Sequence, residues 1–291
     1  MRFKCPNCQE IREANTFPCA NCIEQDGSVI RLMRKKFWTD WKGYLQDFKA
    51  FREQIGARVT DPNAYENMPF GEGENDLLST SWKERRMDLQ FILNHLSEWS
   101  AAQERTEKLQ ILNYGAWNGW LSHQLALNGH ELVTVSPYDD PYDGIGAVKH
   151  FSTDWVAIQM ELTDVDLFVD PFDVIIFNRN LAFFEDPMQA LQNILPKVKP
   201  GGLVLLSGLT FFRKEKKATE NFQRKLKAAT EKFKIKLDYQ PMKGILDTQD
   251  KHTFEALGGR FTPYPPVWKN QWLPLLLPNR ATYGFGVIKR D

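Results

Sequence analysis

The 291-residue sequence predicts an α/β protein in which a doubly wound parallel sheet follows an N-terminal ribbon and a helical segment. Three observations support this class. All four cysteines lie within the first 22 residues. Aromatic and aliphatic residues at helical spacing fill much of the next stretch. From residue 109 onward, short apolar runs alternate with helical segments, which is the pattern of parallel strands covered by helices on both faces.

The composition excludes several classes of protein. Hydrophobic residues make up 42% of the chain, which is too high for a disordered protein. The 37 basic residues balance the 37 acidic ones, so strong non-specific attraction to nucleic acid or membrane is not expected as the main function. No apolar run approaches the roughly 18 residues of a membrane span, and the N-terminus lacks the apolar stretch of a secretory signal. We therefore expect a cytoplasmic protein, of an oligomeric state that the composition does not indicate.

The cysteines form the pattern C-x2-C-x10-C-x2-C. Each C-x2-C pair turns two thiolates toward one point, so two pairs complete the tetrahedral shell of a Zn²⁺ ion. Two disulfides or four buried thiols are the alternatives, and disulfides need an oxidising compartment. Because four thiolates leave no position for a substrate, the predicted zinc ribbon at residues 1–33 is structural. Its predicted ligands are Cys5, Cys8, Cys19 and Cys22.

Residues 34–100 are predicted to form a helical linker or cap. Apolar and aromatic residues recur at close to helical spacing over 34–56. Prolines and glycines interrupt this pattern over 58–80, which predicts a loop. Ser81 and Glu84 then match a capping box ahead of a second helix, which is expected to end near residue 99.

Residues 101–291 are predicted to form the sheet domain. Gly129 is expected to end its first helix, and a Pro-Gly-Gly turn at 200–202 is expected just before the fifth strand. Ligands of doubly wound sheets bind beyond the carboxyl ends of the strands, so the turn after the first strand is the place to search for a site. The expected strands cover 109–112, 131–135, 156–160, 172–177 and 203–207, with helices at 120–127 and 187–195.

The turn at 113–122 reads NYGAWNGWLS. It resembles motif I of class I S-adenosylmethionine-dependent methyltransferases, in the methyltransferase type 11-like branch that reads roughly DLGAGNGWLS. Residues 139–147, DDPYDGIGA, resemble the D-D-x-x-D-G-L-G-A loop of that branch. Residues 172–178 are similar to its fourth strand, and 199–202 to its K-P-G-G turn. An N-terminal ribbon also recurs in the branch. The resemblance spans most of residues 80–210 and implies a Rossmann-like methyltransferase fold.

The resemblance further implies S-adenosylmethionine as the cofactor and methyl transfer as the reaction. Since the sulfonium donor is already activated, the protein contributes mainly the alignment of donor and acceptor. The sequence identifies no catalytic residue, and His150 and Asn178 are the candidates. Arg85 and Arg86 either reach over the cleft or form salt bridges on a helix surface. The implied cofactor-binding residues are Asn113, Gly115, Ala116, Trp117, Gly119, Ser136, Pro137 and Asn178.

Four positions depart from the family pattern. Trp117 replaces the second glycine of motif I, where a glycine lets the backbone approach the cofactor. Ser136 replaces the acid that binds the ribose, which removes charge assistance worth about 1–2 kcal/mol. Asp139 or Asp140 is the candidate to compensate by reaching back. Together the departures suggest altered or lost cofactor binding. The other two departures are Asn113 in place of the motif I acid and Ala182 in place of a histidine.

Three functions remain open. The first is a methyltransferase that acts on an unidentified small-molecule or saccharide-like acceptor. The second is a catalytically degenerate relative that serves as a binding or scaffold protein. The third is an RNA methyltransferase, which a ribbon and a basic helix would help to hold on phosphates, although a neutral chain offers little of the electrostatic footprint that RNA binding needs.

The C-terminal part carries two further features. Ten Lys or Arg lie between Arg213 and Lys236 against three Glu, on a helix expected at 214–236. A solvated helix face or a contact to an anionic ligand explains this charge. Residues 236–239 and 283–289 are expected to form two late strands. The insertion between them, at about 241–281, contains six prolines and two tryptophans and is either a substrate lid or a packed cap.

Overall fold

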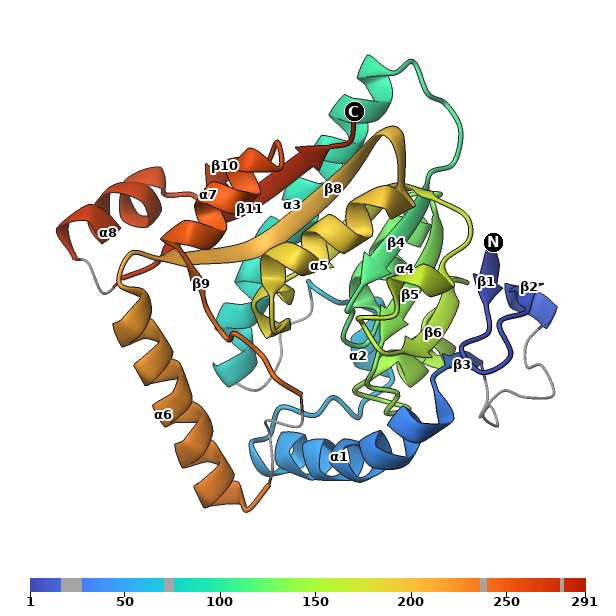
Figure 1. Ribbon diagram of the computed structural model, residues 1–291, viewed down its shortest axis with the longest axis horizontal. Coiled ribbons are helices and arrows are strands. Elements are labelled where there is room, and N and C mark those ends of the chain that lie inside the picture. The colour runs from blue at the N-terminus through green and yellow to red at the C-terminus, as the bar shows by residue number, and fades with distance from the viewer. Residues whose placement is uncertain (17–27, 71–75, 236–239, 278–279) are drawn as a thin grey trace. The chain divides into compact units, whose positions relative to one another are not determined.

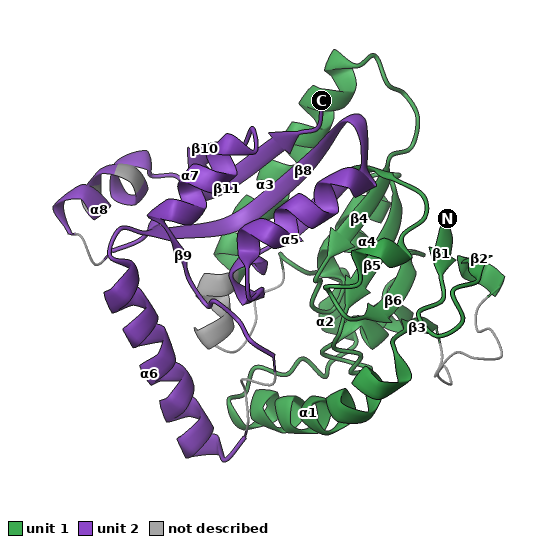
Figure 2. Cartoon of the chain, in the orientation of Figure 1, with its two compact units in different colours: residues 1–173 green, residues 174–291 purple. Residues whose placement is uncertain are grey.

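The computed structural model describes the chain in two compact units, residues 1–173 and residues 174–291 (Figure 2). The boundary between residues 173 and 174 falls inside strand β7 (Phe172–Asn178), so the first two residues of this strand belong to unit 1 and the rest to unit 2. The division into 1–33, 34–100 and 101–291 that the sequence suggests stays a prediction. Residues 17–27, 71–75, 236–239 and 278–279 are outside the described part of the chain.

The N-terminus of unit 1 is a small hairpin. Strands β1 (Arg2–Lys4) and β2 (Ile11–Glu13) pair antiparallel, and the 3-10 turn η1 (Ala14–Thr16) follows. Phe3 is fully buried, and its ring centroid lies 6.0 Å from that of Phe168. This contact attaches the hairpin to the rest of the unit, since the hairpin itself is too small to bury a core.

The helical segment of unit 1 agrees with the sequence in its first part and differs in its second. Helix α1 (Lys35–Gln54) confirms the helix expected at 34–56. The loop expected at 58–80 is wrong at two places, because it contains α2 (Asn63–Glu66) and the first residues of α3 (Asp76–Ala102). Helix α3 begins before Ser81, so the predicted capping box is wrong too. Burial of Tyr65 explains α2, since a four-residue helix depends on tertiary packing.

The sheet of unit 1 confirms the predicted parallel strands. β4 (Gln110–Tyr114), β5 (Glu131–Ser136) and β6 (Val156–Met160) lie side by side in that order, and helix α4 (Trp120–Leu127) connects the first two (Figure 1). Strand β3 (Val29–Leu32) extends the sheet as a parallel neighbour of β6, which the sequence did not indicate. Two 3-10 helices complete the unit, η2 (Ile145–His150) and η3 (Val165–Leu167).

Unit 2 is built around long antiparallel strands. β7 (Phe172–Asn178) confirms the fourth predicted strand, and β8 (Val198–Phe212) pairs antiparallel with β11 (Thr282–Lys289). The turn expected at 200–202 is wrong, because β8 runs through it. Gly201, with a φ of 76°, donates to the carbonyl of Arg290 at 2.8 Å, and the N–H of Arg290 donates to the carbonyl of Gly202 at 2.9 Å, so the residue after β11 fixes this part of β8. The connecting helices are η4 (Leu181–Phe183), α5 (Pro187–Ile194) and η5 (Leu195–Lys197).

The remaining elements belong largely to the insertion at 241–281. It is neither wholly a lid nor wholly a packed cap, since β10 (Arg260–Pro263) pairs antiparallel with β11 and Phe254 of α7 (Thr248–Ala256) is fully buried, whereas two tryptophans are exposed. The strand expected at 236–239 lies outside the described residues. The elements are α6 (Glu215–Phe233), β9 (Leu246–Asp247), α7 (Thr248–Ala256), β10 (Arg260–Pro263), the π-helical turn η6 (Trp268–Trp272) and α8 (Leu273–Leu276).

Among the described residues, no helix combines the length and the apolar character needed to cross a membrane.

Candidate functional site

The turn between β4 and α4 keeps the backbone geometry of a ligand-binding strand–turn–helix unit. Gly115 and Gly119 adopt φ angles of 72° and 86°, a region that favours glycine. A Cβ atom on Gly119 would lie 2.4 Å from the indole of Trp155, so a side chain does not fit there. The backbone N–H of Ala116 donates to the carbonyl of Val135 at 2.8 Å, which ties the turn to β5.

Asn113, which the sequence resemblance aligns with the motif I acid, takes part in a buried network. Its side chain is 2% exposed and donates from Nδ2 to Oγ of Ser122 at 2.9 Å. The hydroxyl of Thr134 donates to the same oxygen at 2.6 Å. The amide therefore links β4, α4 and β5. Its Oδ1 atom has no hydrogen-bond partner within the described part of the chain, so one buried acceptor remains available at this turn.

Trp117 is the centre of a cluster of which the sequence singled out only Trp117 and Arg85. Its indole N–H donates to Oδ1 of Asp143 at 3.0 Å. The guanidinium carbons of Arg52 and Arg85 lie 5.0 and 4.8 Å from its ring centroid, within the range of cation–π attraction. The Trp82 ring lies 6.4 Å away. These five residues are called the tryptophan cluster below. The sequence leaves two alternatives for Arg85, reaching over the cleft or forming a salt bridge on the helix surface, and the structure places it against the Trp117 ring.

Asp143 is the charged anchor of the tryptophan cluster. Its side chain is fully buried and accepts hydrogen bonds from Nε and Nη2 of Arg52 at 2.6 and 3.0 Å. It also accepts from the backbone N–H of Val59 at 3.3 Å. Burial raises the pKa of the Asp143 carboxyl, although the hydrogen bonds from Arg52 oppose this. The cluster thus joins α1 to the loop that follows β5.

The two aspartates that were candidates to replace the ribose-binding acid are held by other partners. Asp139 forms an ion pair with Arg31 at 3.0 Å, and Asp140 forms one with Arg58 at 3.0 Å. Asp140 also accepts two backbone N–H groups of its own loop at 2.9 and 2.8 Å. Both carboxylates are therefore engaged with arginines. This arrangement does not favour the hypothesis that Asp139 or Asp140 binds the ribose in place of the acid that Ser136 replaces.

The end of β5 is covered by protein groups. Ser136 is 2% exposed, and its Oγ accepts the backbone N–H of Tyr138 at 3.2 Å. The carbonyl of Pro137 accepts the indole N–H of Trp41 at 2.8 Å and the amide of Gln159 at 3.1 Å. Side chains from α1 and β6 thus take the hydrogen-bonding capacity of Pro137.

The two catalytic candidates lie in different units. In unit 1, the His150 ring stacks on Tyr65 and Tyr142 at centroid distances of 5.3 and 4.9 Å, and its Nε2 lies 3.1 Å from the carbonyl of Pro141. These contacts describe a packed histidine. In unit 2, Asn178 donates from Nδ2 to Oγ of Ser207 at 2.7 Å. Catalytic roles for both residues stay predictions.

Half of the predicted zinc site is described. Cys5 and Cys8 follow β1 in a tight turn, in which the N–H of Gln9 donates to the carbonyl of Cys5 at 2.9 Å. Gln9 adopts a φ of 65°, so the chain reverses directly after the second thiol. This turn fits a zinc knuckle. Cys19 and Cys22 are outside the described residues, and no cluster of three or more metal-binding side chains occurs among those within them.

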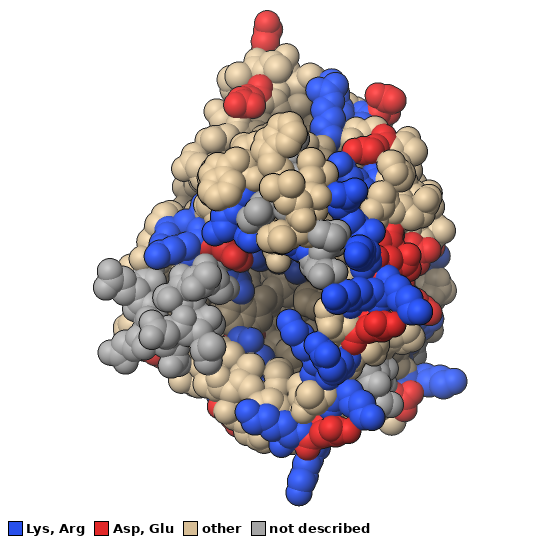
Figure 3. Space-filling model, turned by 90° about the vertical axis from the view of Figure 1, so that its left-hand side faces the viewer, with Lys and Arg blue, Asp and Glu red and all other residues tan. Residues whose placement is uncertain are grey.

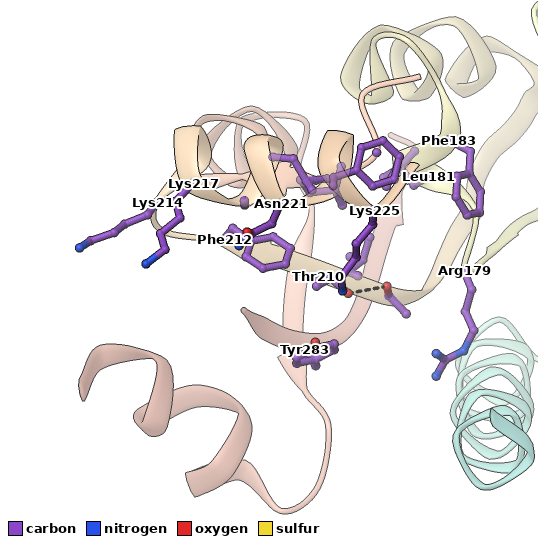
Figure 4. Close-up of a pocket in the computed structure, with 18 of the residues that line it drawn as sticks. Arg179, Leu181, Phe183, Thr210, Phe212, Lys214, Lys217, Asn221, Lys225 and Tyr283 are labelled. Carbon is purple, nitrogen blue, oxygen red and sulfur yellow. Dashed lines mark hydrogen bonds between the residues drawn. The ribbon is translucent and has the colours of Figure 1, made fainter. Parts of the chain in front are cut away.

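Unit 2 contains a cavity of about 520 Å³ that the sequence did not predict as a site (Figure 4). It lies against β8 and α6, and the loop after β7 closes one side. Lys225 extends from α6 toward Thr210 of β8, whereas Lys214 and Lys217 point away from it. The side chains that give the cavity its character are the cations Arg179, Lys214, Lys217 and Lys225 and the aromatic residues Phe183, Phe212, Phe222 and Tyr283.

The segment after α6 fixes the wall of this cavity. Gly244, with a φ of 75°, approaches the Phe222 ring so closely that a Cβ atom would lie 2.0 Å from it. Its N–H donates to the carbonyl of Ala182 at 2.7 Å. Ala182, which the sequence resemblance aligns with a histidine, lines the cavity with its small side chain. The basic residues of α6 were the available signal, but they fit a solvated face equally well in the sequence.

Comparisons with known proteins bear on the fold of the chain. Residues 112–206 match the family model described as a methyltransferase domain. A Galdieria sulphuraria protein assigned as a sarcosine dimethylglycine methyltransferase has a similar structure, with a TM-score of 0.52 and 9% identity over 84% of this chain and 98% of that one. At this identity the likeness concerns the fold alone. The chain therefore has a methyltransferase fold. No sequence among the curated proteins matches it.

Two further solved structures cover the same share of this chain, 84%, and all of their own. The plantazolicin methyltransferase BpumL, in complex with SAH, has a TM-score of 0.47 and 14% identity. The magnesium protoporphyrin IX methyltransferase ChlM from Synechocystis PCC 6803, also with bound SAH, has a TM-score of 0.45 and 14% identity.

Proposed function

We propose that the chain is an S-adenosylmethionine-dependent methyltransferase that acts on an anionic small molecule. The observation that carries this proposal is the strand–turn–helix unit at Gly115 and Gly119, which falls within the matched segment 112–206. The first and third glycines of motif I keep the left-handed backbone that a close cofactor approach needs. The unpartnered Oδ1 of Asn113 supports a polar ligand at the same turn.

The turn and the end of β5 are the proposed cofactor site. The backbone of Gly115 and Ala116 would approach the cofactor, and Ser136 would offer its hydroxyl in place of a carboxylate. The bound cofactor would supply a methyl group that is activated as a sulfonium. Because Trp117 replaces a glycine and Ser136 an acid, the affinity for the cofactor is expected to be low.

The cavity of unit 2 is the proposed acceptor site. Lys225, which extends toward Thr210, attracts a carboxylate or phosphate, and the aromatic side chains of the cavity provide area for the apolar part of a ligand. Ser207 lines this cavity and accepts the hydrogen bond of Asn178, which holds its hydroxyl in one orientation. Asn178 is accordingly proposed as a positioning residue, which acts on an acceptor through Ser207.

Isothermal titration with S-adenosylmethionine and with S-adenosylhomocysteine tests the proposal. We expect binding of both compounds in the high micromolar range, about tenfold weaker than a site with the ribose carboxylate would give. Absence of heat with either compound up to millimolar concentration would contradict a cofactor-dependent enzyme. Binding of S-adenosylhomocysteine alone would indicate that the natural ligand resembles this demethylated product and is not the methyl donor.

The tryptophan cluster supports a second candidate function. Trp117 is fixed by Asp143, Arg52 and Arg85, so the position of the missing glycine is filled by protein. This arrangement suits a methyltransferase fold that has become a binding or scaffold module. This second hypothesis predicts that the protein does not bind the cofactor but still binds a ligand in the unit 2 cavity. The third hypothesis is an RNA methyltransferase, and a salt-dependent shift of RNA in a gel on addition of the protein would support it.

We further propose that zinc stabilises the ribbon at residues 1–33, in a reducing cytoplasm that keeps the thiolates available. Protein purified without chelator is expected to contain one zinc ion per chain. Removal of the metal should unfold the hairpin of β1 and β2 and leave the parallel strands β4, β5 and β6 intact, as circular dichroism would record. Cys5→Ser should lose the metal, and Ser152→Ala serves as a control. Metal analysis that finds no zinc in the native chain would contradict the proposal.

A further inference from the structure

Residues 267–277 of unit 2 expose an unusual amount of apolar surface. This stretch, called the apolar segment below, comprises η6 and α8 with their flanking residues. Single exposed apolar side chains are ordinary, but a contiguous group of them marks an interaction surface. The exposed fractions range from 46% to 78% for Val267, Trp268, Trp272, Leu275, Leu276 and Leu277.

The apolar segment is held in place by its polar groups and by one buried proline. Asn270 donates from Nδ2 to the carbonyl of Tyr264 at 3.0 Å, and Pro274 is buried. Tyr264 is 4% exposed, and its ring centroid lies 4.1 Å from that of Phe285 on β11. The base of the segment is thus attached to the sheet of unit 2, while its large apolar side chains remain outside.

Basic side chains lie next to the apolar segment. Arg213, which precedes α6, has its Nη1 atom 3.4 Å from the carbonyl of Leu275, so the start of α6 adjoins α8. Lys214 directly precedes the helix, Lys216 and Lys217 lie in its first turn, and all three are exposed. Figure 3 shows the side of the molecule on which α6 and α8 lie, where a broad area of uncharged side chains is bordered by Lys and Arg.

We propose that this surface docks on an anionic phospholipid surface without crossing it. Tryptophan side chains favour the headgroup region of a bilayer, and exposed leucines bury area in the acyl boundary. Neighbouring lysines and arginines add attraction to anionic headgroups. The zero net charge of the chain does not oppose this, because Arg213, Lys214, Lys216 and Lys217 form a local group of positive charge. The inference is independent of cofactor binding, since all of its residues belong to unit 2.

Co-sedimentation of the full chain with vesicles tests this surface. Vesicles of phosphatidylcholine with phosphatidylglycerol should bind the protein, and vesicles of phosphatidylcholine alone should bind it much less. Changing both Trp268 and Leu276 to Gln should lower the partition coefficient at least about tenfold. Changing Lys216 to Gln should lower it about fivefold and weaken the dependence on salt. Leu127→Gln is the matched control, because Leu127 is 58% exposed and belongs to unit 1.

Three results would overturn the proposal. The first is equal binding to neutral and anionic vesicles, and the second is unchanged binding of the double variant that keeps its circular dichroism spectrum. The third is absence of vesicle binding together with concentration-dependent self-association that the double variant abolishes. That third result would make the apolar segment an interface between copies of this chain.

Discussion

Replacing Asp143 by alanine is expected to lower the free energy of unfolding by about 3–5 kcal/mol. The carboxylate is fully buried and is bonded to Nε and Nη2 of Arg52, a side chain that is 19% exposed. Its removal leaves a largely buried guanidinium without its counter-ion and takes the acceptor from the indole N–H of Trp117. Urea unfolding followed by circular dichroism measures this change.

Two variants calibrate this result. Asp170→Ala removes a carboxylate whose partner, Arg2, is 55% exposed, so a loss of no more than about 1 kcal/mol is expected. Asp143→Asn keeps an acceptor for Trp117 but lacks the charge, and should fall between the two. An Asp143→Ala variant that unfolds at the urea concentration of the parent protein would show that Arg52 finds another partner or reaches water.

Changing Trp117 to Gly together with Ser136 to Asp is expected to raise the affinity for S-adenosylmethionine at least about tenfold. The first change removes the indole from the turn after β4, and the second places a carboxylate at the end of β5. A charge-assisted hydrogen bond to a ribose hydroxyl contributes more than the neutral hydroxyl of Ser136 does. Titration calorimetry on the double variant and its parent measures the gain.

The single variants separate the two causes. Ser136→Asp alone should gain little, because Trp117 stays fixed by Asp143 and two arginines. Trp117→Gly alone should gain part of the affinity. If the folded double variant binds no better than the parent protein, the pocket is closed by other groups, of which the side chains that cover Pro137 are the first to consider.

The parallel core was predictable because its signals are local. Apolar runs such as 156–160 match β6 at both ends, and helix α4 begins and ends where the sequence indicates. The course of β8 through Pro200-Gly201-Gly202 was not predictable, because it depends on β11. Gly201 is hydrogen-bonded to Arg290, about ninety residues away in the chain. A local turn signal was overruled by tertiary pairing.

Part of the candidate site was also predictable from local sequence, and part depended on the fold. The departures at Trp117 and Ser136 are visible in the sequence, since a motif fixes where a glycine and an acid belong. The partners of Trp117 are not visible, because Arg52, Arg85 and Asp143 come from α1, α3 and a loop that only the fold brings together. The unit 2 cavity was missed for a related reason, since a lysine on a helix has the same pattern whether it faces solvent or a cavity.

The arginines of the N-terminal segment have a consequence for how the protein changes in evolution. Arg31, Arg52 and Arg58 each hold one carboxylate of the loop at 139–143. Loss of the arginine or of the aspartate of such an ion pair leaves the other side chain largely buried without its counter-ion. Substitutions on the two sides are therefore expected to occur together, so that the first sixty residues and the loop after β5 are inherited as one correlated set.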